Sequence, residues 1–185
     1  MRGARIKGGE NSYYHCISRV IDRKFVLKRQ EKDRLVELLV QASTFSGVEV
    51  VTYVMMGNHF HLLIKANPDV VVTDPMLADR LKCLYGQSRT ADIMTLLGDL
   101  KSRGDFASAE EYKRRFTCRM QDVSQFMKLF KQLYTRWHNS KYKRKGTLWE
   151  DRFKSVLVES GQALKMMAAY LDLNPVRAGI VTDPR

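Results

Sequence analysis

The sequence is poor in cysteine, and the few it has are badly placed for structural chemistry. Cys16, Cys83 and Cys118 are widely spaced and form no CxxC pair. An odd and scattered set supports neither a disulfide framework nor a cysteine-based zinc site. A reducing, cytoplasmic setting therefore fits best.

Long apolar runs are also missing. No stretch approaches the roughly 20 apolar residues that a membrane-spanning helix needs. Residues 1–11 are basic and contain glycine but lack the apolar core of a signal peptide. We therefore expect no contact with a membrane and interpret residues 1–11 as a flexible basic arm.

Acidic residues are the third shortage. Lys and Arg number 32 against 20 Asp and Glu, which gives a net charge of +12 over 185 residues. Such a surplus favours a polyanionic partner, most often nucleic acid. The length suits one domain with its own core.

The hydrophobic pattern predicts alternating strands and helices. Strands are expected over 12–20, 48–56, 59–66 and 153–158, where β-branched and aromatic residues dominate. Helical spacing of apolar residues predicts helices over 30–46, 74–85, 122–139 and 162–173, with Ser160 as the cap of the last. Residues 86–118 are polar and charged, and we interpret them as an insertion that is helical in places.

The segment Gly57-Asn58-His59-Phe60-His61-Leu62 holds two of the four histidines. Gly57-Asn58 is a turn signal, so both histidines lie at the start of the second strand of a hairpin. Side chains alternate along a strand, so His59 and His61 share one face, and Phe60, Leu62 and Ile64 form an apolar stripe that points to the core. The pair is either a divalent-metal site or two histidines on a solvated strand face. His15, in the first strand, is interpreted as a hydrogen-bonded strand histidine.

Residues 140–154 are the densest basic stretch and include aromatic rings. Cations bind phosphates and rings stack on unpaired bases, so we expect nucleic-acid contact here. The alternative is a solvated loop whose tryptophan fills the core. With the basic arm, the candidate DNA-binding residues are Arg2, Arg5, Lys7, Lys141, Lys143, Arg144, Lys145, Trp149, Arg152 and Lys154.

Near the C-terminus, Tyr170 and Asn174 are four residues apart and so share a helix face. Neither lies on the apolar stripe of Leu164, Ala168 and Leu171. Taken alone, a half-buried packing tyrosine and a helix-ending asparagine before a proline explain them.

Three segments together resemble the single-tyrosine HUH transposases, in particular the REP-associated tyrosine transposase branch of the insertion-sequence type. The segments are Gly57-Asn58-His59-Phe60-His61-Leu62, residues 146–155 and residues 170–179, in the family's order. The resemblance covers about residues 12–181, with the middle unassigned. It implies an α+β fold, namely a single HUH domain of ferredoxin-like or RRM-like type in which an antiparallel sheet carries helices mainly on one face.

The resemblance also implies roles for individual residues. His59 and His61 would be metal ligands, Asn174 a third ligand, and Tyr170 the nucleophile. The metal would be Mg²⁺ or Mn²⁺, and imidazole ligands favour the latter. The reaction would cleave single-stranded or hairpin DNA and transfer the strand through a 5′-phosphotyrosine intermediate. A phenol has a pKa of about 10 and is a poor nucleophile unless assisted, and a metal on the phosphate supplies that assistance.

Other readings stay open at this point. A non-catalytic nucleic-acid-binding module of the same fold would bind DNA without cutting it, and a hydrolytic metal enzyme would not need Tyr170. A homodimer, with Tyr170 acting in its own subunit or in its partner's, is another option. The chain ends soon after the third segment, which suits either a natural short form or a fragment lacking a C-terminal region. By its chemistry we expect the protein to be cytoplasmic and associated with the bacterial nucleoid.

Overall fold

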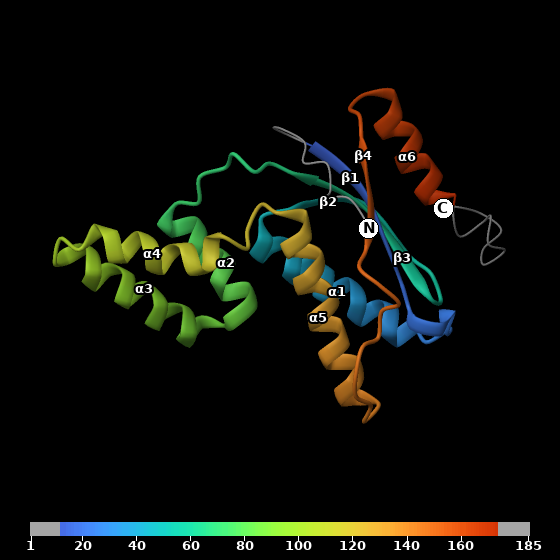
Figure 1. Cartoon of the computed structure of the whole chain (residues 1–185), viewed down its shortest axis with the longest axis horizontal. Coiled ribbons are helices and arrows are strands. Elements are labelled where there is room, and N and C mark those ends of the chain that lie inside the picture. Colours follow the sequence, from blue (N-terminus) through green and yellow to red (C-terminus); the bar gives the residue numbers. More distant parts are fainter. Residues whose placement is uncertain (1–11, 174–185) are drawn as a thin grey trace.

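A four-stranded antiparallel sheet forms the centre of the protein in the computed structural model, which describes residues 12–173 (Figure 1). The strands are β1 (Ser12–Arg19), β2 (Glu49–Met55), β3 (His59–Ala66) and β4 (Lys154–Val158). Their order is β2-β3-β1-β4, which places β1 and β3 in the middle and β2 and β4 at the edges. The predicted α+β fold with an antiparallel sheet is confirmed.

One face of the sheet packs against two long helices, α1 (Arg29–Ser46) and α5 (Val123–Lys141). The predicted stripe of Phe60, Leu62 and Ile64 points to this side, and all three residues are 0% exposed. They join Tyr14 and Cys16 of β1 and apolar residues of both helices in the main core. We call this the core face of the sheet.

The opposite face carries the histidines and is covered by the last helix, α6 (Gln162–Asp172). Leu171 of α6 is fully buried in a second cluster with Val54, Leu63 and Val158 of three different strands. Leu164 and Ala168 pack against this cluster, as the predicted stripe requires. We call this the histidine face; Figure 1 shows α6 apart from α1 and α5.

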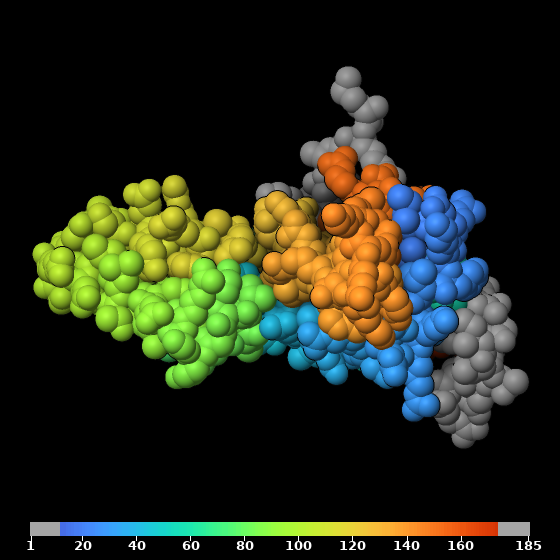
Figure 2. Space-filling view, turned by 90° about the horizontal axis from the view of Figure 1, so that it is seen from below, coloured from blue at the N-terminus to red at the C-terminus, as the bar shows by residue number. Residues whose placement is uncertain are grey.

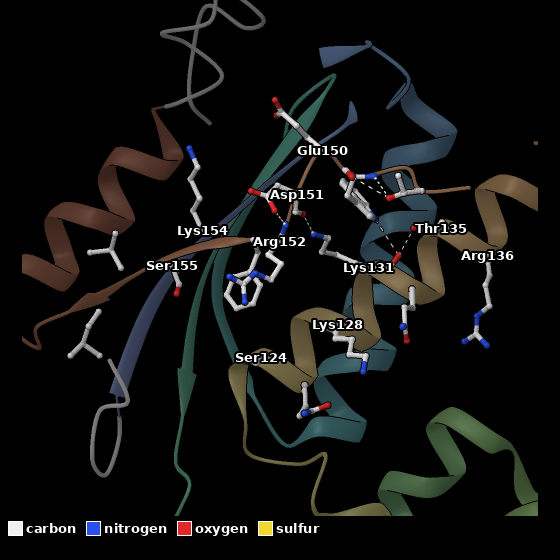
Figure 3. Close-up of a pocket in the computed structure, with 17 residues that line it drawn as sticks. Ser124, Lys128, Lys131, Thr135, Arg136, Glu150, Asp151, Arg152, Lys154 and Ser155 are labelled. Atoms are coloured by element: carbon white, nitrogen blue, oxygen red, sulfur yellow. Dashed lines mark hydrogen bonds between the residues drawn. The ribbon is translucent and has the colours of Figure 1, made fainter. Parts of the chain in front are cut away.

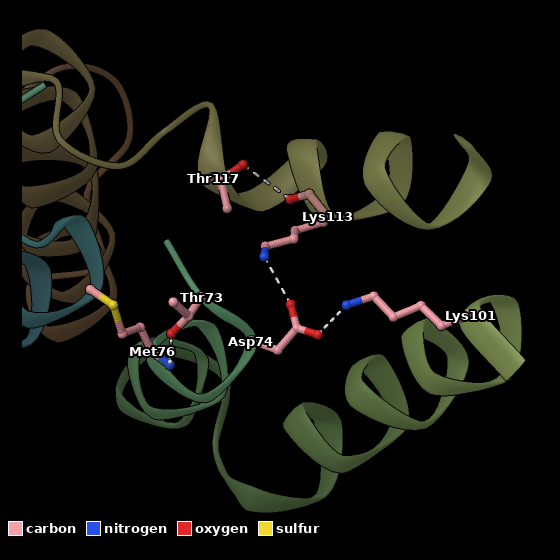
Figure 4. A network of polar contacts seen from close by, with 6 residues as sticks. All are labelled: Thr73, Asp74, Met76, Lys101, Lys113 and Thr117. Carbon is pink, nitrogen blue, oxygen red and sulfur yellow. Dashed lines mark hydrogen bonds and ion pairs between the residues drawn. The ribbon is translucent and has the colours of Figure 1, made fainter. Parts of the chain in front are cut away.

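Three helices form a lobe at one end of the molecule: α2 (Asp74–Tyr85), α3 (Gln87–Ser102) and α4 (Phe106–Thr117). They have their own small core, which includes Leu77, Leu81 and Leu97. The Asp74 carboxylate joins the helices by pairing with Lys101 of α3 and, at 2.8 Å, with Lys113 of α4 (Figure 4). The segment interpreted as an insertion is thus largely helical, and Figure 2 shows the lobe projecting from the rest.

The helix ends follow local chemistry. Gly47 ends α1 in the left-handed conformation with φ of 65°, which glycine adopts without strain. The Asp122 side chain accepts a bond from the Gln125 amide at 2.9 Å and caps α5. The expected cap at Ser160 is wrong, because α6 begins after Gly161 and has no side-chain cap.

In the part of the chain from residue 12 to 173, the structure has no helix long and apolar enough to cross a bilayer.

Candidate active site

The turn that leads into the two histidines is held firmly by a neighbouring loop. The Gly57 carbonyl accepts a bond from the Leu27 amide at 2.9 Å, and the Asn58 carbonyl accepts one from Val20 at 2.8 Å. A Cβ atom at Gly57 would lie 2.7 Å from the ring of Phe25, so a larger residue would displace this ring. The start of β3 is therefore fixed by backbone bonds and close packing.

His59 and His61 lie on the same face of β3, as predicted, and their ring centroids are 5.1 Å apart. The Nδ1 atom of His59 lies 2.7 Å from the Asn58 side-chain oxygen. The Nδ1 atom of His61 lies 3.0 Å from Nε2 of His15 on the adjacent strand. Each ring is thus held through Nδ1, which leaves its Nε2 for another partner.

Burial keeps these imidazoles neutral. It lowers the pKa of His15, and at His59 the nearby Arg19 lowers the pKa further. Burial together with His15, His59 and Arg19 lowers the pKa of His61 to about 4. At pH 7 the rings are uncharged, which is the form that binds metal ions.

Arg19 places a positive charge beside the two histidines, and the sequence analysis missed this residue. It pairs with His59 across β1 and β3 and therefore projects from the same face. Its charge reaches both His59 and His61, as the lowered pKa values show. The signal in the sequence was only the basic residue that ends the first strand, which no motif marked as functional.

Helix α6 brings Tyr170 to this face of the sheet. The neighbouring Leu171 shares a buried cluster with Val54 and Leu63. Val54 is the cross-strand partner of His61, and Leu63 is the next residue of β3 on the same face as His61. Tyr170 itself is 41% exposed. The Thr52 hydroxyl of β2 donates to Oδ1 of Asp172 at 3.4 Å, and this bond ties the end of α6 to the sheet edge.

The predicted third ligand, Asn174, lies outside the described residues. Within residues 12–173 there is no group of three or more His, Cys, Asp or Glu side chains that could hold a metal ion. The donor set nevertheless suits a metal, since two neutral imidazoles share one face of β3 and the Nδ1 atom of each already has a side-chain partner. A metal here would need further ligands from other groups, such as the Asn174 amide or a phosphate.

The basic stretch differs from the prediction at its tryptophan. Trp149 is only 5% exposed, its Nε1 donates to the Lys131 carbonyl at 3.2 Å, and its ring meets Phe60 edge-on. The ring fills the core, as the alternative interpretation held, and is not available to stack on a base. Tryptophan is a highly buried residue on average, so its position among cations was weak evidence for an exposed ring.

The cations of this stretch fall into two groups. Lys141 pairs with the buried Glu31 at 2.6 Å, and Arg144 bonds to the Asn139 side chain and the Thr147 carbonyl, so both shape the loop. Lys143, Lys145, Arg152 and Lys154 are exposed. The arm residues Arg2, Arg5 and Lys7 lie outside the described residues.

A large groove runs between α5 and the segment 147–157, with a volume of about 1610 Å³ (Figure 3). Its lining includes Lys128, Lys131 and Arg136 of α5 together with Arg152 and Lys154. Burial lowers the pKa of Lys131 to about 8, against the opposing effect of Asp151. We call this the basic groove. The sequence analysis did not single out the three cations of α5.

The described residues thus form an α+β fold in which an antiparallel sheet carries paired histidines on one face, and the helix that contains Tyr170 packs on that same face. Residues 9–88, which include β1, β2 and β3, match the family model described as "Transposase IS200 like". Over this segment the family resemblance drawn from the sequence is confirmed.

Two solved structures are similar to this chain, and the first of them shares its fold. A REP-associated tyrosine transposase bound to a REP hairpin is 12% identical, with a TM-score of 0.63, and the match covers 100% of this chain and 78% of that one. A suggested transposase from Deinococcus radiodurans R1 is 18% identical, with a TM-score of 0.44, covering 91% of this chain and 95% of that one. No curated protein matches the chain.

Proposed function

We propose that the protein cleaves and rejoins single-stranded DNA beside a hairpin, with Tyr170 as the nucleophile and a divalent metal held by His59 and His61. The observation that carries this proposal is the packing of α6 on the histidine face, where Leu171 joins the residues beside His61. The match of residues 9–88 to the IS200-like transposase model supports a transposase, and the similar REP-associated structure is bound to a hairpin.

The roles of the residues follow from their positions. His59 and His61 present Nε2 atoms that would hold Mg²⁺ or Mn²⁺, with Asn174 as the proposed third ligand. When bound, the metal draws charge from the scissile phosphate and fixes it for in-line attack. Arg19, which lies opposite His59, adds positive charge on the same face. This face therefore suits a phosphodiester group.

In the proposed reaction the Tyr170 oxygen bonds to phosphorus and the bond from phosphorus to the 3′ oxygen breaks. The phenol loses its proton, and the leaving 3′ oxygen gains one from solvent. Tyr170 then holds the 5′-phosphate of the DNA, and the released end is a 3′-OH. Because the new ester conserves the energy of the old one, a second 3′-OH can reverse the step and join the strands without ATP.

The basic groove is our candidate for holding the hairpin. It carries three cations from α5, together with Arg152 and Lys154, and Lys154 is the first residue of β4. Such a surface neutralises phosphates without reading bases. Lys143 and Lys145 are exposed on the loop that precedes the groove, and we propose that they extend it.

The test uses a DNA hairpin with single-stranded flanks, labelled at its 3′ end, incubated with Mn²⁺. A covalent protein–DNA adduct should form, should vanish in EDTA and should be lost in Tyr170→Phe. Tyr53→Phe is the matched control, because Tyr53 is 43% exposed but lies on the core-face side, paired with Leu62. Binding without an adduct under all metal conditions would instead favour the non-catalytic DNA-binding module. Normal cleavage by Tyr170→Phe would show that another nucleophile acts.

A further inference from the structure

One buried histidine has no role in the reaction described above. His15 lies in the middle of β1, is 7% exposed, and its Nε2 atom is 3.0 Å from Nδ1 of His61. The two rings are nearly parallel, with an angle of 11° between their planes. A contact between two ring nitrogens at this distance requires one proton between them, carried by one ring or the other.

The position of that proton decides what His61 can do. If Nε2 of His15 carries it, Nδ1 of His61 accepts the bond, and a neutral His61 then has its own proton on Nε2. That nitrogen cannot bind a metal. If Nδ1 of His61 carries the proton and donates it to His15, the lone pair of His61 lies on Nε2, away from His15.

We propose that His15 is a positioning residue that holds His61 with its proton on Nδ1 and its metal-binding lone pair on Nε2. The proposal rests on the function proposed above. His15 itself is directed at Nδ1 of His61, so it acts through that ring rather than as a further ligand.

The neighbouring ring shows the same arrangement with a different partner. The Asn58 oxygen lies 2.7 Å from Nδ1 of His59, and the Asn58 amide nitrogen donates to the Arg23 carbonyl at 2.9 Å. Since that nitrogen is used as a donor, the oxygen is the atom that accepts from His59. Each of the two histidines thus has a fixed acceptor at Nδ1, one from the turn and one from β1.

The acceptor at β1 also fits its surroundings. His15 is only 7% exposed and its ring stacks on that of His61, so the ring is confined by burial and by this contact. A confined ring keeps its orientation, which is what a positioning residue needs. Partners that orient metal-binding histidines in this way typically change metal affinity 10- to 100-fold when they are replaced.

The experiment measures Mn²⁺ binding to the whole protein by titration calorimetry, without DNA, in four variants. His15→Leu removes the acceptor and should weaken Mn²⁺ binding by about 10-fold or more. His15→Gln keeps an acceptor oxygen near the position of Nε2 and should retain most of the affinity. Tyr13→Phe, a change on the same face of β1, is the control for a general disturbance of the strand and should bind normally. His61→Ala reports whether the metal uses this site at all.

The outcomes separate the two proposals. Normal binding by His15→Leu together with loss of binding by His61→Ala would overturn the role of His15 and leave the metal site intact. Equal losses in His15→Leu and His15→Gln would also overturn it, because the acceptor would not matter. Normal binding by His61→Ala would remove the metal site itself, and with it both proposals. Thermal unfolding in EDTA checks that each variant is folded.

Discussion

The two faces of the sheet differ in what they bury. The core face presents Phe60, Leu62 and Ile64 to α1 and α5 and is closed with aromatic and aliphatic side chains. The histidine face carries His15, His59 and His61, and among the described residues α6 is the helix that covers part of it. Because neighbouring residues of β3 point to opposite faces, one strand both anchors the fold and presents the site. Breaking one face should therefore leave the other measurable.

The largest expected effect is on the core face. Phe60→Ala removes a fully buried ring that contacts Phe130 and Trp149, and should lower the free energy of unfolding by about 3–5 kcal/mol. His59→Ala, one residue away on the other face, should lower it by less than about 1 kcal/mol. Urea unfolding measures both. Similar losses in the two variants would mean that the histidine face is part of the main core.

The second prediction concerns the buried carboxylate of Glu31, which joins α1 to the end of α5 on the core face. Glu31 of α1 is 2% exposed and accepts bonds from Lys141 and the Tyr142 hydroxyl, each at 2.6 Å. Burial alone would raise the pKa of Glu31, but these bonds outweigh it and lower the pKa to about 2. Glu31→Gln should cost about 2 kcal/mol of stability at pH 7.

The pH dependence gives the sharper form of this prediction. A carboxyl with a lowered pKa stabilises the fold above its unfolded value of 4.5, and this contribution is lost as the pH falls toward 2. Between those values Glu31→Gln should therefore lose less stability than the unchanged protein. Glu37→Gln is the control, since Glu37 pairs with Arg34 on the surface. Identical acid profiles for Glu31→Gln and the unchanged protein would contradict this account.

The histidine face should fail in a different pH range. The pKa of His61 is lowered to about 4 from 6.5, so the unfolded chain takes up a proton that the folded site refuses. Stability should therefore fall as the pH drops from about 6.5 to about 4, by roughly 1–2 kcal/mol after allowing for solvent. In EDTA, His61→Gln should show a smaller fall over this range. An unchanged profile would mean that His61 is protonated equally in both states.

The sequence predicted what depends on periodicity and missed what depends on distant contacts. The alternation through His59, Phe60 and His61 was enough to place the strand, its buried stripe and the shared face of the histidines. The bond between His15 and His61 joins residues 46 positions apart, and no local pattern marks it. The prediction that Trp149 contacts DNA was wrong for the same reason. Whether this ring faces DNA or the core depends on Phe60 and α5, which are distant in the sequence. The covering of a second face by α6 likewise depends on β2, β3 and β4 together.

The smallest effect tests whether the basic groove, rather than the lobe, carries the DNA. Lys128 is an exposed cation of the groove, whereas Lys82 lies on α2 in the lobe, 46% exposed and beside Asp79. Each lysine that neutralises one phosphate of a single strand adds about 0.7 to the slope of log K against log salt. Lys128→Ala should therefore reduce that slope by about 0.7 and weaken hairpin binding at low salt, while Lys82→Ala should change neither. Fluorescence anisotropy at several salt concentrations measures the slopes. The reverse result would move the DNA from the groove to the lobe, and would give α2, α3 and α4 the role that we have assigned to α5.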